Sequence, residues 1–420
     1  MRRVFETLLG FAVLTGVVVG ITTLTPAELP RVTTVEAIRS TKVVCVPAAA
    51  GATVMVDNTT TVTPLGGATT QTNRAVLTGQ ETSVVAEGTD GPTGSTIVGN
   101  DGVRTLTQCV KPVSRGVIAL PATADTQLKI VNPDASEAAI DLTLYGAEGE
   151  IQSLGARGIT LAAYEERAIA LSVLTKKATP VGVSFQASRG RAAVMAITQT
   201  QSSGTAAGPS QLGTSHLLPG IPAGATSSVI VLANPSETRI TANLTAYGTT
   251  PAYHPQGGEN ISIPSHASVS VSLENALLGE ASAIQVSSDA PVMAGMAFTL
   301  GDSAQVAPVS AGTSLGAFTP PGGTLQLTNP GEGDVQATVT ATGADGTEER
   351  TTVTVGTGQT TVHKLPTATE QGQRVVVSSD QPLFGAVVSS GDTGSWAAPL
   401  ESMTKGENPP LAAELDPGLH

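Results

Sequence analysis

Histidine is the residue type in this chain that could most readily bind a metal or move a proton. The chain contains five, at His216, His254, His266, His363 and His420. None has a second histidine or a cysteine at the spacing of metal ligands, so the sequence predicts no metal site. His266 and His363 fall at similar places in successive repeats, where we expect surface turns.

Paired carboxylates would offer acid–base chemistry if both groups reached one cleft. Asp289 and Asp380 occupy matching positions of two repeats, at what we interpret as hairpin turns. Because they belong to different repeats, we expect turn residues here. No nucleophile elbow, phosphate-binding loop or zinc-protease motif is present in the sequence. The sequence therefore predicts no catalytic residue and no cofactor, and favours a protein that is not an enzyme.

The N-terminus reads as a membrane-targeting segment. Arg2 and Arg3 precede an apolar run from Leu8 to Leu24, which would form a helix slightly shorter than a bilayer core. We favour an uncleaved signal-anchor over residues 1–27, with the bulk of the chain outside the cytoplasm at the cell membrane. A cleaved signal peptide of a secreted protein is the alternative, although its best cleavage site, Thr25-Pro26-Ala27, is poor.

Two cysteines, Cys45 and Cys109, are the only ones in the chain. An even count in an exported protein favours a disulfide, and their similar flanks, VVCVP and TQCVKP, fit two neighbouring strands. Two buried free thiols are the alternative. A metal site is disfavoured because no histidine lies near either cysteine.

Composition limits the classes of partner. The net charge is −13, without a Lys/Arg patch, which argues against nucleic acid. Aromatic residues make up 3% of the chain, which counts against the aromatic platforms of sugar sites. Frequent Thr, Val, Gly and Pro are typical of short strands joined by turns.

One pattern recurs three times, as LKIVNPDASEAAIDLTLYG (128–146), IVLANPSETRITANLTAYG (230–248) and LQLTNPGEGDVQATVTATG (325–343). The shared spacing predicts tandem copies of one structural unit. Proline lacks an N–H for a β-ladder and asparagine can close an Asx turn, so the Asn-Pro pair should end a strand. The closing glycine should supply a positive φ. These signature residues are Asn132, Pro133, Gly146, Asn234, Pro235, Gly248, Asn329, Pro330 and Gly343.

Tyr145 and Tyr247 precede the closing glycine in the first two copies. We expect them to pack over a strand end, and the alternative is that they line a surface. After each Asn-Pro pair, apolar residues alternate strictly with polar ones, which is the pattern of a half-buried strand.

About seven short strands per repeat predict an all-β fold of tandem immunoglobulin-like β-sandwiches, with a β-propeller-like arrangement as the alternative. Each repeat should end in a hairpin, turning at Arg189-Gly190, Asp289–Pro291 or Asp380–Pro382. The stretch 201–213 reads as a flexible loop. We expect a stalk (28–41), an N-terminal module (42–115), three repeats (116–214, 215–315 and 316–402) and a disordered tail (403–420). Whether the N-terminal module is a further copy stays open.

The order of three motif groups resembles the actinobacterial family designated DUF5719, whose members are uncharacterised envelope proteins. They are SRGVIALP…LKIVNP…LTLYG (114–146), ASRGRAAV (187–194) and LLPGIP…LANPSE (217–237). The third repeat departs, with Thr342 in place of tyrosine. The resemblance implies an exported or membrane-anchored β-rich protein, often encoded beside a polytopic glycosyltransferase, and supplies no catalytic residues.

The sequence thus favours a non-enzymatic, membrane-anchored scaffold or accessory subunit of cell-envelope assembly. Its partners would be the membrane and a polytopic glycosyltransferase or another envelope protein. A cell-wall polysaccharide-binding module is the alternative function.

Overall fold

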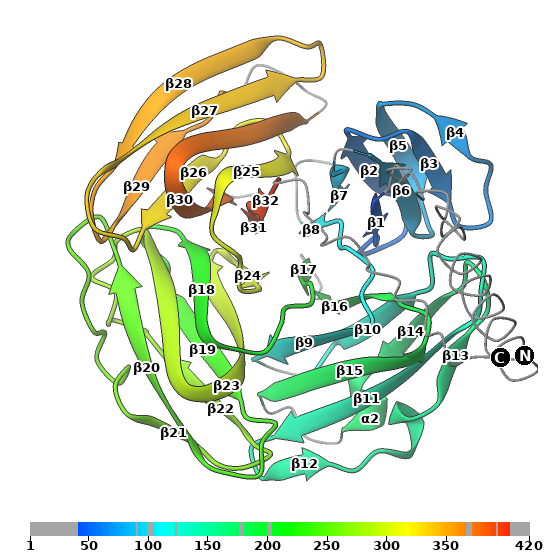
Figure 1. Ribbon diagram of the computed structural model, residues 1–420, viewed down its shortest axis with the longest axis horizontal. Helices are drawn as coiled ribbons and strands as arrows, with labels where there is room; N and C mark the ends of the chain where they lie inside the picture. Colours follow the sequence, from blue (N-terminus) through cyan, green and yellow to red (C-terminus); the bar gives the residue numbers. More distant parts are fainter. Residues whose placement is uncertain are drawn as a thin grey trace, which may run out of the picture. The chain divides into compact units, whose positions relative to one another are not determined.

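The computed structural model describes residues 41–89, 91–99, 105–121, 124–175, 180–199, 204–366, 372–391 and 394–403. The expected anchor (1–27), all but the last residue of the expected stalk, and the tail beyond Met403 lie outside the described residues. In the part of the chain that the structure describes, no helix has the length and apolar character needed to cross a membrane. From Thr41 onward the described residues form one compact unit, and its sheets are arranged like the blades of a propeller (Figure 1).

Four modules follow one another around this unit, and their strands are almost its whole secondary structure. The N-terminal module contains β1 (Thr41–Cys45), β2 (Ala52–Asp57), β3 (Thr61–Pro64), β4 (Thr70–Gln71), β5 (Arg74–Gln80), β6 (Val84–Gly88), β7 (Thr93–Val98) and β8 (Thr105–Gln108). The first repeat contains β9 (Arg115–Leu120), β10 (Thr126–Val131), β11 (Ala138–Gly146), β12 (Gly149–Ile151), η1 (Leu154–Ala156), β13 (Ile159–Leu161), β14 (Glu166–Ala170), α2 (Leu171–Leu174), β15 (Val181–Arg189), β16 (Ala193–Gln199) and β17 (Gly204–Ala207).

The remaining two modules are the second and third repeats. The second contains β18 (Gly213–Ile221), β19 (Ser227–Ala233), β20 (Ile240–Tyr247), β21 (Ile261–Ile263), β22 (Ser268–Ser272), β23 (Ser282–Leu300) and β24 (Asp302–Val306). The third contains β25 (Gly312–Thr319), β26 (Thr324–Asn329), β27 (Val335–Gly343), β28 (Glu348–Val355), β29 (Gln359–Lys364), β30 (Gln373–Gly391), β31 (Gly394–Pro399) and β32 (Glu401–Ser402).

All four modules share one topology of seven strand positions, which we letter a to g in chain order. One sheet has the order d-c-f-a, as in β21-β20-β23-β18, and the other has the order e-b-f-g, as in β22-β19-β23-β24. This is not the pairing of an immunoglobulin domain, in which A, B, E and D form one sheet and C, F and G the other. The expected all-β class is confirmed, while the strand pairing follows a different order because strand f belongs to both sheets.

Strand f is where the hairpin prediction is wrong. In the second and third repeats it is one strand of 19 residues, β23 and β30, which runs on through Asp289 and Asp380. Its first half pairs with strands a and c, and its second half pairs with strand b. In the first repeat the strand is interrupted at Gly190, and β15 and β16 take the two roles. A register shift bends the strand from one sheet to the other, as bulges do.

The N-terminal module is a fourth copy of the unit. Its sheets, β1-β6-β3-β4 and β5-β2-β7-β8, repeat the a-f-c-d and e-b-f-g orders of the other modules. Thr59 takes the place of the signature asparagine, because its N–H donates to Asn73 O and its hydroxyl donates to Thr72 O. The shorter strands and the missing Asn-Pro pair conceal the relationship in the sequence.

The alternating residues of strand c form the core of each repeat. Ile140, Leu142 and Leu144 of β11 are buried, and their equivalents in β20 and β27 are buried as well. The residues between them are less buried, as the period of two requires.

The innermost strand g of each module closes the ring. β8 contacts β17, β17 contacts β24, β24 contacts β31, and β31 contacts β8 (Figure 1). The expected flexible loop at 201–213 therefore contains an inner strand of the ring, β17, and that interpretation is wrong. Each module touches two neighbours at the centre, so the inner strands hold four modules in fixed positions.

Candidate functional site

The signature asparagines are structural residues buried at the end of strand b. Asn132, Asn234 and Asn329 are each at most 2% exposed. Each side-chain amide donates to the carbonyl four residues ahead, at 2.7, 2.7 and 2.8 Å respectively. Each side-chain oxygen also accepts the backbone N–H two residues ahead, which is an Asx turn. Pro133, Pro235 and Pro330 follow these asparagines at the points where the ladder ends.

The sequence predicts that the closing glycines supply a positive φ, but the structure gives a different reason for glycine at these positions. Gly146, Gly248 and Gly343 do not have positive φ angles, so that prediction is wrong. At Gly248 an added Cβ would collide with the carboxylate of Glu280, which accepts hydrogen bonds from the N–H groups of Thr249 and Thr250. At Gly146 it would press on the Ile151 side chain. A larger residue at either position would have to displace one of these side chains.

The two signature tyrosines pack between modules. Tyr145 is buried with Ala119 of its own repeat and with Ala233 and Met293 of the second repeat. Its ring also stacks on that of His266, with 6.1 Å between the ring centroids. Tyr247 is buried against Phe384 of the third repeat.

The disulfide between Cys45 and Cys109 is present. It joins the end of β1 to the residue after β8, and Val44 and Val110 form a bridge beside it. The bond lies in the core of the N-terminal module, with Val54, Val56 and Val84 packed around it.

The histidines are not brought together. His216 is buried, and its Nε2 lies 3.0 Å from Gly213 O and 2.9 Å from Val292 O. Burial lowers the pKa of His216 and favours the neutral ring. His266 does lie in a turn, but His363 lies on β29, so the two are not equivalent.

The other singled-out side chains are also dispersed. His254 contacts Leu244 O, at 2.9 Å from its Nδ1, and His420 lies outside the described residues. Asp289 accepts the N–H of Thr241 at 3.0 Å within its own module. Among the described residues, no group of three His, Cys, Asp or Glu side chains could hold a metal ion.

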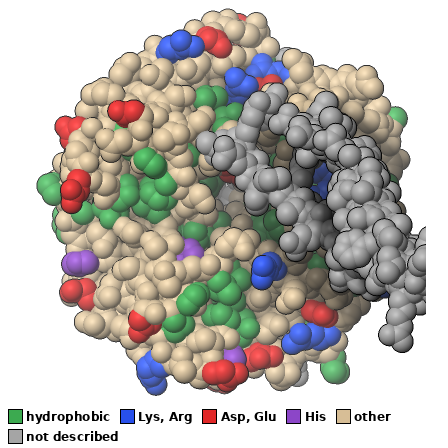
Figure 2. Space-filling model, in the orientation of Figure 1, with side chains coloured by type: hydrophobic (Ala, Val, Ile, Leu, Met, Phe, Trp, Pro, Cys, Tyr) green, Lys and Arg blue, Asp and Glu red, His purple; other side chains and the backbone are tan. Residues whose placement is uncertain are grey.

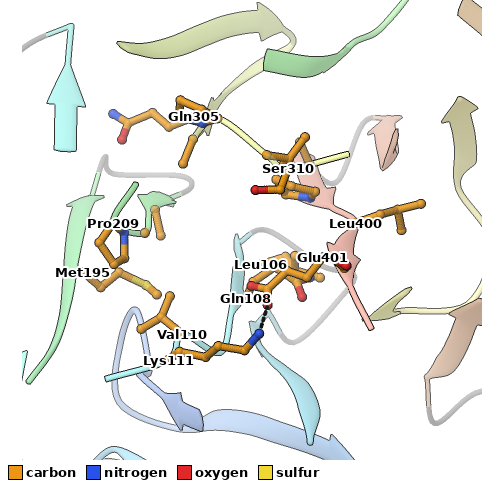
Figure 3. A pocket seen from close by; sticks show the side chains of 18 residues that line it. Leu106, Gln108, Val110, Lys111, Met195, Pro209, Gln305, Ser310, Leu400 and Glu401 are labelled. Carbon is orange, nitrogen blue, oxygen red and sulfur yellow. Dashed lines mark ion pairs between the residues drawn. The ribbon is translucent and has the colours of Figure 1, made fainter. Parts of the chain in front are cut away.

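The four inner strands lead into a pocket at the ring's centre, which we call the axial pocket. Its volume is about 270 Å³, and all four modules line it. The N-terminal module contributes Leu106, Gln108, Val110 and Lys111, and the first repeat contributes Met195 and Pro209 (Figure 3). The second repeat contributes Gln305 and Ser310, and the third contributes Leu400 and Glu401 (Figure 3).

One ion pair crosses the axial pocket, between the first and last modules. Lys111 Nζ lies 3.8 Å from Glu401 Oε2 (Figure 3). Both side chains stay partly exposed, at 49% and 43%, because they face the hollow. Protein nonetheless surrounds the hollow, and the resulting desolvation raises the pKa of Glu401, while Lys111 partly offsets that rise.

A second polar group on the wall is incompletely paired. Gln305 is buried, and its Nε2 donates to Thr198 Oγ1 at 3.3 Å. Its Oε1 has no hydrogen-bond partner in the described part of the chain. A buried amide atom without a partner costs free energy.

The outer face is less distinctive. On the face shown in Figure 2, charged side chains of both signs are scattered over the visible surface. The axial pocket, with its crossing ion pair, is therefore the strongest candidate site.

Comparison with known proteins identifies a family. Residues 93–366 match the model described as "Family of unknown function (DUF5719)". The chain belongs to this family. The DUF5719 match confirms the resemblance found in the sequence, and it runs from β7 of the N-terminal module to the residues after β29.

No curated protein matches this DUF5719 chain. Among solved structures, the chain has a similarity to the crystal structure of a tetra-tandem repeat in the extending region of a large adhesion protein. It is 13% identical, covers 87% of this chain and 100% of that chain, and has a TM-score of 0.10. At that TM-score the similarity supports no conclusion about fold or function.

Sequence reasoning missed the axial pocket, although a weak signal exists. A proline follows each inner strand or ends it, at Pro112, Pro209, Pro308 and Pro399. Three of these four prolines line the pocket. The tetrapeptides that contain them are KPVS, GPSQ, APVS and APLE. Only the proline is common to all four, so the repeat is hard to see without the structure.

Proposed function

We propose that this chain is a non-enzymatic, membrane-anchored extracytoplasmic scaffold or accessory subunit of cell-envelope assembly. Residues 1–27 would anchor it, and the ring would contact a polytopic membrane glycosyltransferase or another envelope protein. The closed ring of inner strands is the observation that carries the proposal. A ring whose modules each contact two neighbours can present several binding surfaces at fixed separations, which is what a scaffold needs.

The disulfide supports the proposed location outside the cytoplasm. Disulfides persist in oxidising environments and are rare in reducing ones. Cys45–Cys109 is buried in the module that completes the ring, so its formation would be coupled to folding outside the cytoplasm.

Site-directed photo-crosslinking in living cells tests this proposal. A photoreactive residue would replace Leu154, Leu278 or Val362, which are exposed apolar side chains on three different repeats. The full-length chain would carry a C-terminal tag, and captured molecules would be identified by mass spectrometry. We expect a polytopic membrane protein to be captured from one or two of these positions and not from the others.

A matched control replaces residues 1–27 with an unrelated transmembrane helix. Capture that survives the exchange places the contact in the ring, and capture lost with it places the contact in the membrane helix. Recovery of wall polysaccharide without any protein would overturn the proposal and favour a polysaccharide-binding module. Turnover of an envelope substrate by the purified chain alone would also overturn it.

A further inference from the structure

The charges of the axial pocket break the fourfold repeat of the ring. Lys111 stands before the proline of its module, where the other modules have Gly208, Ala307 and Ala398. Glu401 stands two residues after its proline, where the others have Ser114, Gln211 and Ser310. Two modules, the first and second repeats, therefore build the inner ring with neutral residues at both positions, and at each position three of the four modules are neutral. Ring closure does not require the two charges, so another role has to explain them.

Lys111 and Glu401 form only a long ion pair with each other. At 3.8 Å, Lys111 Nζ and Glu401 Oε2 are beyond ordinary hydrogen-bond distance. Among the described residues, no second hydrogen bond or ion pair engages either head group. Holding opposite charges in a partly desolvated hollow is costly unless further hydrogen bonds complete them. A ligand with both a positive and a negative group would give each of the two head groups a hydrogen-bonded counter-charge.

The rest of the pocket limits the ligand. Leu106, Val110, Met195 and Pro209 supply apolar wall beside the ion pair (Figure 3). A volume of about 270 Å³ lies just below the usual range of ligand pockets, so the occupant is small. A ligand with a single charge would pair with one of the two head groups. It would then draw that group away from its present partner and leave the partner without a counter-charge.

We propose that the axial pocket binds a small zwitterion of the α-amino-acid type. Lys111 would receive the carboxylate, Glu401 would receive the ammonium group, and the apolar wall would hold an aliphatic side chain. This site is independent of the proposed scaffold function, because it needs no protein partner.

Calorimetric titration of the purified full-length chain tests the site, with L-leucine as the probe. N-acetyl-L-leucine lacks the ammonium group and L-leucinamide lacks the carboxylate, while both keep the side chain. We expect L-leucine to bind and each analogue to bind at least about tenfold more weakly, since each leaves one pocket charge uncompleted. Equal binding of all three would show that the charges are not read and would overturn the proposal.

The variant Lys111→Gln/Glu401→Gln removes both charges and keeps similar side-chain lengths. We expect it to lose about tenfold or more in affinity for L-leucine. The control, Arg189→Gln/Glu137→Gln, removes an exposed ion pair of 2.7 Å elsewhere and should bind as the unaltered chain does. Thermal unfolding of both variants verifies that the ring is intact. Failure of the unaltered chain to bind L-leucine or a panel of smaller aliphatic amino acids at millimolar concentration overturns the proposal and leaves the scaffold function untouched.

Discussion

The seams between repeats and the seam that closes the ring are built differently. Where the first repeat meets the second and the second meets the third, a tyrosine at the end of strand c is buried against the next module. Where the third repeat meets the N-terminal module, Thr342 takes that place, and Arg74 reaches across instead. Arg74 donates to Gly343 O at 2.7 Å, pairs with Asp57 at 3.2 Å, and lies 5.6 Å from the centre of the Phe318 ring.

The difference teaches how one topology accommodates a smaller member. The N-terminal module has short strands and a small core around its disulfide, so it offers less apolar surface to a neighbour. A long side chain with a charged head can span such a gap, because its stem packs while its head finds carbonyl and carboxylate partners. Its other seam, with the first repeat, adds an ion-paired cluster of Lys42, Asp134 and Arg191 to an apolar cluster.

Removing the disulfide should have the largest effect on the difference between the N-terminal module and the three repeats. The double variant Cys45→Ala/Cys109→Ala opens a loop with a sequence separation of 64 residues. We expect a loss of roughly 4 kcal/mol, because the unfolded chain regains the entropy that the crosslink removed. Hydrogen exchange read by mass spectrometry should show lost protection in β1, β2 and β7, while β19 and β20 keep theirs. Uniform loss over all four modules would contradict a difference between the seams.

Truncating a signature tyrosine should come next. Tyr247→Ala empties a buried position between the second and third repeats, and we expect a cost of about 3 kcal/mol. The melting temperature measured by calorimetry gives the effect, with exposed Tyr164→Ala as the control near zero. A cost for Tyr247→Ala no larger than that of the control would show that the tyrosine does not hold the seam.

Arg74→Met tests the closing seam. The variant keeps much of the apolar stem but loses the bond to Gly343 O and leaves the partly buried Asp57 with Arg374 at 3.6 Å. We expect a loss of about 1–3 kcal/mol. The stabilising effect of Arg74 should fall as salt screens the pair, whereas the cost of Tyr247→Ala should not. Equal salt dependence of the two variants would argue against a polar closing seam.

Asp134 makes the seam with the first repeat sensitive to acid. Its hydrogen bond from Arg191, together with Lys42, lowers the pKa of Asp134 from its usual 3.8 to about 2, against the opposing effect of burial. A carboxyl whose folded pKa is lowered contributes stability above its unfolded pKa and loses it as the pH falls towards the folded value. We expect Asp134→Asn to cost about 1–2 kcal/mol at pH 7 and almost nothing near pH 2. Melting temperatures of both proteins between these pH values provide the check, and a constant difference would refute the assignment.

The smallest effect distinguishes the two tyrosines. The Tyr247 hydroxyl donates to Gln285 Oε1 at 2.5 Å, so Tyr247→Phe should cost about 1 kcal/mol. The Tyr145 ring is buried and stacked on His266, and its hydroxyl makes no such hydrogen bond to any described residue, so Tyr145→Phe should be close to neutral. Melting temperatures of the two variants, measured side by side, provide the comparison. The reverse order would mean that the hydroxyl of Tyr247 does not stabilise the seam.

Local patterns in the sequence predict much of the fold. The alternation after Asn132, Asn234 and Asn329 identified strand c, because a strand with one buried face must alternate. The Asx turns at these asparagines and the Cys45–Cys109 bond were also predicted, since turn chemistry and cysteine count are local or compositional signals. The repeated spacing identified three copies of the unit, and the motif order identified the family.

Other features depend on contacts between residues far apart in the sequence, which no local pattern predicts. The sequence does not reveal that strand f crosses between two sheets, because both halves alternate as a hairpin would. Nor does it show that the small N-terminal module is a fourth copy, since its topology is kept while Thr59 replaces the signature asparagine. The axial pocket joins residues as distant as Lys111 and Glu401, and only closure of the ring brings them within 3.8 Å. Spacing and periodicity determined what each module is made of, whereas long-range contacts among the inner strands decided how the modules close and where a ligand could bind.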